Sequence, residues 1–141
     1  MVIADATISQ DVWSAVRTKV VAAAPYVSNS STAATTAASI NSVFNDKTAA
    51  RPQIIINPAL IDEGDWKFGG LQGKKVINVV IECYYSNTLG IDQLWDQVRA
   101  ALDDNDLDGI DLVAITTDYG FSSPGEQKFH VKSGTFTYQR E

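Results

Sequence analysis

The segment from Lys74 to Ser86 restricts the fold more than any other part of the chain. Its alternate residues form one apolar face, namely Ile77, Val79, Ile81, Cys83 and Tyr85. Further apolar residues fall on the opposite face, namely Val76, Val80 and Tyr84. Side chains alternate between the two faces of a strand, so a strand that is apolar on both faces is central in its sheet or covered on both sides. The sequence therefore predicts a central strand over 74–86.

One amphipathic helix is predicted before this strand and one after it. The apolar residues of the first recur at helical spacing, namely Ile8, Val12, Ala15, Val16, Val20 and Ala23. Thr7 and Gln10 are spaced as a capping box at its start, and Pro25 ends it, which predicts a helix over Ile8–Ala24. The second follows the i, i+3, i+4, i+7 rule closely, through Ile91, Leu94, Trp95, Val98, Ala101 and Leu102.

Three further strands are predicted. Ile54–Ile56 is a β-branched run with Pro52 and Pro58 at its ends, where a strand tolerates proline, and it suits the edge of a sheet. Residues 59–73 are rich in glycine and polar side chains and predict a long connection. The last two strands are expected over 110–119 and 127–138, joined by a turn at FSSPGE.

The stretch from Ser28 to Ala50 is rich in Ser, Thr and Ala. Its first half has few large apolar side chains to offset the entropy of ordering it, so a mobile loop is expected there. In its second half, Ile40, Val43 and Phe44 lie at helical spacing and predict a short helix that ends near Asn45.

The order of these elements, αββαββ, predicts an α+β fold. We expect a four-stranded, mainly antiparallel sheet with both helices packed against it, the second helix joining two hairpins. A length of 141 residues is typical of one domain, 1–141, and a hydrophobic share of 45% is enough for a real core.

Composition also restricts function and location. A net charge of −6 argues against nucleic-acid binding, because such binding depends on clustered Lys and Arg. No apolar run is long enough to span a membrane, and residues 1–10 have neither a basic leader nor a continuous apolar core. We therefore expect a soluble chain that stays in a reducing cytoplasm, with its single Cys83 buried and inert.

The sequence offers no recognisable catalytic set, so we expect no enzymatic activity and no cofactor. His130 is the only histidine and lies in a predicted strand, which favours a structural or surface role. The stretch GGLQGKK resembles the start of a phosphate loop, but it precedes a strand, whereas phosphate loops open a helix.

Asp104, Asp106 and Asp108, followed by Gly109, match the first half of a calcium loop, which uses alternate carboxylates and a glycine turn. The second half is missing, because the position of the closing glutamate holds Ile115. The same residues suit an acidic turn between a helix and a strand, so the sequence allows both interpretations.

Trp66 and Phe68 lie in the polar connection DEGDWKFGG, where no periodic element is available to bury them. Aromatic residues in such loops are enriched at protein interfaces. We predict that Trp66 and Phe68, together with Arg51, contribute to a subunit interface. The alternative is that the two aromatic side chains pack back over the edge of the sheet.

The layout of the whole chain resembles the tail terminator family, also called tail completion or minor tail proteins, of long-tailed bacteriophages and related archaeal viruses. The likeness rests on the order of these segments rather than on single motifs: DVWSAVRTKV, RPQIIINP, KKVINVVIECYYSN, IDQLWDQVRAALDD, LDGIDLVAITTDYG and KFHVKSGTFTYQRE.

That resemblance implies a structural virion protein, assembled in the host cytoplasm, that forms a hexameric ring. The ring would cap the tail tube, end its polymerisation and offer a surface to the head, with a tail tube protein and a head-completion or neck protein as partners. DNA would only pass through the channel, and no membrane is implied. A head–tail connector or neck adaptor, a small calcium-binding domain and a hydrolase with an unrecognised site are the alternatives.

Overall fold

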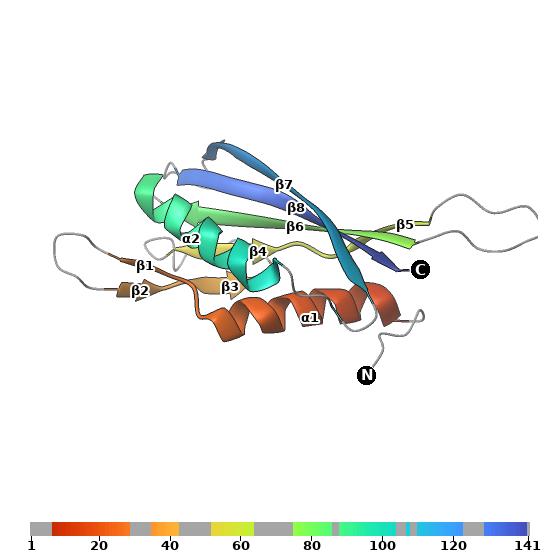
Figure 1. Ribbon diagram of the computed structural model, residues 1–141. Coiled ribbons are helices and arrows are strands. Elements are labelled where there is room, and N and C mark those ends of the chain that lie inside the picture. The colour runs from red at the N-terminus through yellow and green to blue at the C-terminus, as the bar shows by residue number, and fades with distance from the viewer. Residues whose placement is uncertain are drawn as a thin grey trace, which may run out of the picture.

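The computed structural model describes residues 7–28, 35–42, 52–63, 75–85, 88–103, 107, 110–122 and 129–140. Its helices are α1 (Ile8–Ala23) and α2 (Thr88–Leu102). Its strands are β1 (Tyr26–Ser28), β2 (Thr35–Ala37), β3 (Ser39–Asn41), β4 (Gln53–Ile56), β5 (Leu60–Glu63), β6 (Lys75–Tyr85), β7 (Asp111–Ser122) and β8 (Phe129–Arg140). The α+β class is confirmed: two helices pack on a mixed, mostly antiparallel sheet (Figure 1).

Strand β6 lies in the middle of the sheet, as its two apolar faces predict. The strand order is β3-β4-β6-β8-β7, and β5 continues beyond β4 along the same side of β6. On its other side β6 pairs antiparallel with β8 over its whole length, from Lys75 to Tyr85. Strands β7 and β8 form the second hairpin, and α2 is the crossover that joins the two hairpins.

The sheet has more strands than the four predicted. Leu60–Glu63 forms β5 inside the segment expected to be a connection, and β4 is not at an edge, because β3 pairs parallel to it. The predicted helix near Asn45 is wrong at Ile40, which lies in β3; Val43, Phe44 and Asn45 fall outside the described residues. Strands of three or four residues are too short to show a period of two.

Part of the Ser/Thr/Ala-rich stretch is also a strand rather than a mobile loop. Thr35–Ala37 forms β2, which pairs antiparallel with β1. Backbone hydrogen bonds hold such a ladder without large side chains, and β1 is tied to α2 by two glutamines. Gln97 Nε2 donates to Tyr26 O at 2.7 Å, and Ser28 N donates to Gln93 Oε1 at 2.9 Å.

Helix α1 matches its predicted bounds, but the predicted capping box does not form. Thr7 makes no side-chain cap; its hydroxyl donates instead to Asp11 Oδ2 at 2.6 Å. The helix ends as predicted before Pro25, with Ala24 in the left-handed conformation at φ 48° and its N–H on Val21 O. Neither helix described here is long and apolar enough to cross a membrane.

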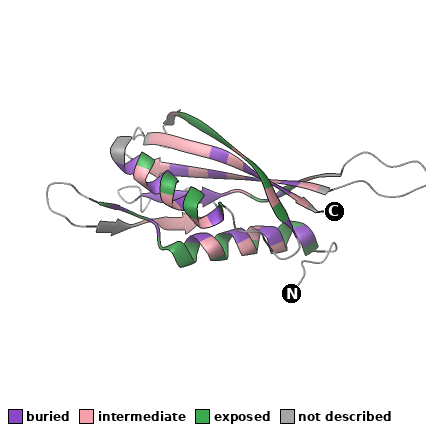
Figure 2. Cartoon of the chain, in the orientation of Figure 1, coloured by how far each residue is buried: buried purple, intermediate pink, exposed green. Residues whose placement is uncertain are grey.

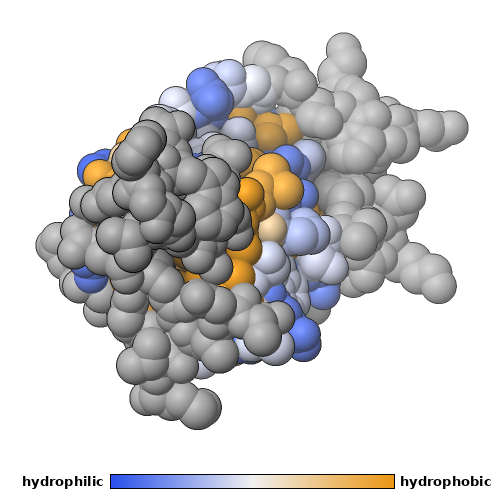
Figure 3. All heavy atoms as spheres, turned by 90° about the vertical axis from the view of Figure 1, so that its right-hand side faces the viewer, coloured by the Kyte–Doolittle hydropathy of each residue, from blue (hydrophilic) through white to orange (hydrophobic). Residues whose placement is uncertain are grey.

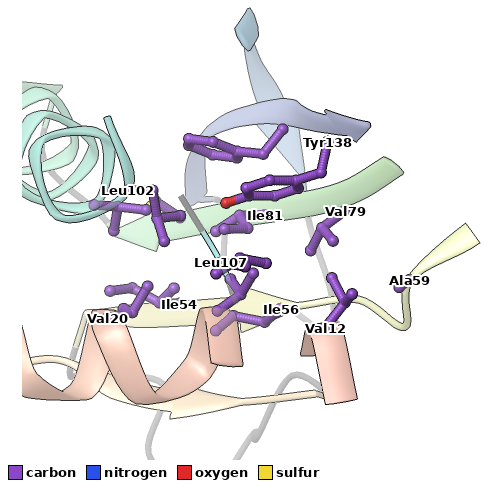
Figure 4. Close-up of a cluster of buried hydrophobic side chains, with 14 of the residues drawn as sticks. Val12, Val20, Ile54, Ile56, Ala59, Val79, Ile81, Leu102, Leu107 and Tyr138 are labelled. Atoms are coloured by element: carbon purple, nitrogen blue, oxygen red, sulfur yellow. The ribbon is translucent and has the colours of Figure 1, made fainter. Parts of the chain in front are cut away.

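The core lies between the helices and one face of the sheet (Figures 2 and 4). Apolar side chains from every layer meet there, including Val12 and Val20 of α1, Ile54 and Ile56 of β4, Val79 and Ile81 of β6, Leu102 of α2, and Tyr138 of β8. Trp13 adds a polar link between α1 and the sheet, because its Nε1 donates to Ile56 O at 2.8 Å.

Trp95 of α2 packs against β8 at a place where only glycine fits. A Cβ at Gly134 would overlap Thr116 O and lie 2.5 Å from the Trp95 ring. The Trp95 and Phe136 rings lie 5.7 Å apart between centroids, so the helix sits close over this strand.

We expect Gly134→Ala to lower the free energy of unfolding by about 2–3 kcal/mol, because a backbone carbonyl and a buried ring must both shift. Gly120→Ala is the matched control, since a Cβ there meets nothing within 4 Å, and it should stay within about 0.5 kcal/mol of wild type. Urea denaturation of both variants measures the difference. Equal stability of the two would contradict the packing of α2 on β8.

Candidate functional site

No described helix covers the face of the sheet opposite α1 and α2. We call its residues on the last three strands the open face. They are Val76, Asn78, Val80, Glu82 and Tyr84 of β6, Val131, Ser133, Thr135, Thr137 and Gln139 of β8, and Asp111, Ala114, Thr116, Asp118 and Gly120 of β7. These residues are half-buried on β6 and β8, and most of those on β7 are exposed. Across β4 the same face is closed, since Gln53 is 1% and Ile55 4% exposed.

The charges on the open face are all negative among the described residues. Glu82, Ser133 and Asp118 lie in one row across β6, β8 and β7, and Asp111 lies further along β7. The Glu82 carboxylate is held in place, because it accepts the Tyr84 hydroxyl at 2.6 Å and Asn57 Nδ2 at 3.4 Å. This surface therefore repels polyanions rather than binding them.

Strand β7 is the second candidate surface, because it ends the sheet. Of the described strands only β8 pairs with it, and Figure 2 shows most of its length exposed. A bulge between Leu112 and Ala114 interrupts its pairing with β8 and leaves Val113 52% exposed. An edge strand presents backbone N–H and C=O groups to which another strand can add.

Strand β5, which pairs with β6 off the main strand order, also exposes an apolar side chain. Leu60 of β5 is 65% exposed. Figure 3 views the end of the molecule where β5 and the start of β6 lie, and hydrophobic residues gather there between hydrophilic ones. Strands β5 and β7 therefore both carry exposed apolar side chains.

A small hollow lies beside α1. It has a volume of about 280 Å³ and is lined by Ser9, Gln10, Trp13, Ser42, Pro58 and Ala59. Its walls are mostly apolar and carry no charged side chain, so it offers van der Waals contact but no group that could do acid–base chemistry.

His130 takes part in a polar cluster on the helical side of β7 and β8. Its Nδ1 lies 2.5 Å from the Tyr119 hydroxyl, and the two rings stack with centroids 5.9 Å apart. Nearby, Lys132 donates to Asp92 Oδ1 at 3.0 Å and ties β8 to α2. Half of the Asp92 side chain is exposed, so this ion pair contributes little to stability.

The Cys83 thiol is fully buried in the core, as expected from the sequence. Burial raises the pKa of the Cys83 thiol far above its usual range, because the thiolate would lose its hydration.

We expect the native protein to react with maleimide at least about a thousandfold more slowly than the urea-unfolded chain, since reaction requires opening of the core. Ala100→Cys, at an exposed position of α2, is the control and should label rapidly at one site. Mass spectrometry counts the labels, and rapid labelling of wild type would show that Cys83 is accessible.

The metal and interface candidates predicted from the sequence lie outside the described part of the chain. This holds for the metal candidates Asp104, Asp106 and Asp108 and for the interface residues Arg51, Trp66 and Phe68. Within the described ranges, no group of three or more His, Cys, Asp or Glu side chains could hold a metal ion. The sequence analysis missed the open face and the β7 edge. The alternation of Ser133, Thr135 and Thr137 with Gly134, Phe136 and Tyr138 along β8 was the available signal.

No protein-family model matches the chain, and no curated protein matches its sequence.

Proposed function

We propose that this protein is a ring-forming structural subunit of a virus tail, a tail terminator that caps the tail tube, ends its polymerisation and provides the surface for head joining. The open face is the observation that carries this proposal. A ring through which DNA passes needs an inner surface that nucleic acid does not grip. A half-buried sheet face with only acidic charges, Glu82, Asp111 and Asp118, meets that need.

The architecture supports the same proposal. Both helices cover one face of the sheet, so the other face is left for the inside of an assembly. The open face is also rich in short polar side chains, including Ser133, Thr135 and Thr137. Such side chains tolerate water, as the wall of a channel requires.

Native mass spectrometry and negative-stain electron microscopy of the purified protein test the proposal. We expect a closed ring of about six subunits, formed alone or on the ends of added tail tubes. A protein that stays monomeric and ignores tail tubes contradicts it. Co-sedimentation with heads rather than with tubes would instead assign the chain to a head–tail connector or neck adaptor.

The charge of the open face gives a second prediction. We expect Asp118→Lys to make the assembled protein retain double-stranded DNA at low salt, with retention lost as salt rises, because lysine displaces counterions from phosphates. Asp96→Lys is the matched control, since it makes the same charge change at an exposed position of α2. Electrophoretic mobility shift at several salt concentrations measures both. Equal DNA retention by the two variants would contradict an inward-facing open face.

A further inference from the structure

The hairpin of β1 and β2 is attached to the molecule differently from every other described strand. It forms a two-stranded sheet of its own, whereas β3 to β8 share the main sheet. We call its residues, Tyr26–Ser28 and Thr35–Ala37, the strap. An isolated two-stranded hairpin is marginally stable at best in water. The strap therefore depends on its contacts with α2, beside which β1 lies (Figure 1).

Two glutamines of α2 hold β1 as a neighbouring strand would. The Tyr26 N–H donates to Gln97 Oε1 at 3.2 Å, and Gln97 Nε2 donates to Tyr26 O at 2.7 Å, so one side chain meets both backbone groups. The Ser28 N–H donates to Gln93 Oε1 at 2.9 Å, and Gln93 Nε2 donates to the Ser28 hydroxyl at 3.0 Å. All four bonds are exposed to water, which competes for the same groups, so each adds little net stability.

Val27 is the apolar anchor of β1. Its side chain is 3% exposed, although Tyr26 and Ser28 on either side of it are exposed. It packs over α2 at Gly90, since a Cβ at Gly90 would lie 3.4 Å from Val27 Cγ1. β1 thus rests on α2 through one buried side chain and two glutamines. A segment with so few buried contacts opens more easily than the core, where apolar side chains from every layer meet.

The chain enters the strap through a strained residue. Ala24, which lies between α1 and Pro25, has φ 48° and ψ 58°, and no other described non-glycine residue has a positive φ. Alanine avoids this left-handed region, and a residue before proline is driven toward extended backbone. A return of Ala24 to extended backbone would turn the strap away from α2. The closed position therefore stores strain at its own hinge.

We propose that the strap opens and closes over α2 as a unit while the rest of the molecule stays folded. It turns about Ala24 and about Ala38, the single residue between β2 and β3. The Ala38 N–H donates to Pro25 O at 2.9 Å, and this bond joins the two strands at their base and keeps them together during the movement. Opening uncovers Val27 and the surface of α2 at Gly90. Every contact in this device lies within one copy, so it does not depend on the proposed ring.

Thiol labelling measures the opening directly, with Cys83 as an internal reference. In Val27→Cys the new thiol is covered while the strap lies on α2, whereas Cys83 is buried in the core. We expect maleimide to label position 27 at least about a hundredfold faster than Cys83 in the same native molecule. Low urea should speed the labelling of Cys83 and leave that of position 27 almost unchanged, because only global unfolding exposes much new surface. Tyr26→Cys gives the rate of an uncovered thiol and should label faster than both, since Tyr26 is 41% exposed.

Two further substitutions, each added to Val27→Cys, test the hinge and the glutamine bonds. Ala24→Gly removes the strain, because glycine enters the left-handed region freely, and should slow labelling at position 27 about threefold. Gln97→Leu removes both bonds to Tyr26 and should speed this labelling about fivefold. Gln10→Leu is the matched control, since it makes the same change at an exposed position of α1, and it should leave the rate unchanged.

Hydrogen exchange of the wild-type protein gives the same comparison without a substitution. The amides of Tyr26 and Ser28 should exchange more slowly than unprotected amides and at least about a hundredfold faster than the amide of Ile81 in β6.

Each outcome decides the proposal. Exchange and labelling of the strap at the rates of the core, with the same urea dependence, would show that it opens only on global unfolding and overturn the proposal. Labelling at position 27 as fast as in Tyr26→Cys would show that the strap does not close on α2. An unchanged rate in Ala24→Gly overturns the hinge, and equal rates in Gln97→Leu and Gln10→Leu overturn the docking.

Discussion

The pairing of β6 with β8 is the interaction on which the rest of the structure depends. It runs along all 11 residues of β6 and joins the β3-β4-β5 side of the sheet to the β7–β8 hairpin. The face that this pair turns to the helices carries Ile77, Val79, Ile81 and Phe136, each fully buried. Without it, each half of the sheet would lose the neighbour that completes its core.

Both described helices lie on one face of the sheet. α2 packs on β6 and β8 with Trp95 against Gly134, and α1 lies beside α2 and is linked to β4 through Trp13. Both helices therefore pack on the same face of the sheet. The open face therefore has no described helix over it, and its short polar side chains suit contact with water.

The long elements were predictable because they repeat a pattern over many residues. The sequence analysis predicted five elements at positions close to those observed, namely α1, α2, β6, β7 and β8. The short strands β2, β3 and β5 were not predicted. A strand of three or four residues shows too little periodicity, and its position is fixed by partners that are distant in the sequence. For the same reason β4 was placed at an edge: nothing in Ile54–Ile56 indicates that β3 lies beside it. The open face was missed because the sequence does not say which strand face the helices cover.

Charge and shape together determine how copies of this chain can meet. Two open faces brought together would oppose Glu82 and Asp118 of one copy to the same row of another, and like charges within a Debye length of about 8 Å repel. The helical face is already filled by α1 and α2. The sheet edges remain, where Leu60 and Val113 are exposed and the described part of β7 carries no lysine. Repulsion on the open face thus disfavours face-to-face contact between copies, so the edges are the described part of the sheet that carries exposed apolar side chains without such a barrier.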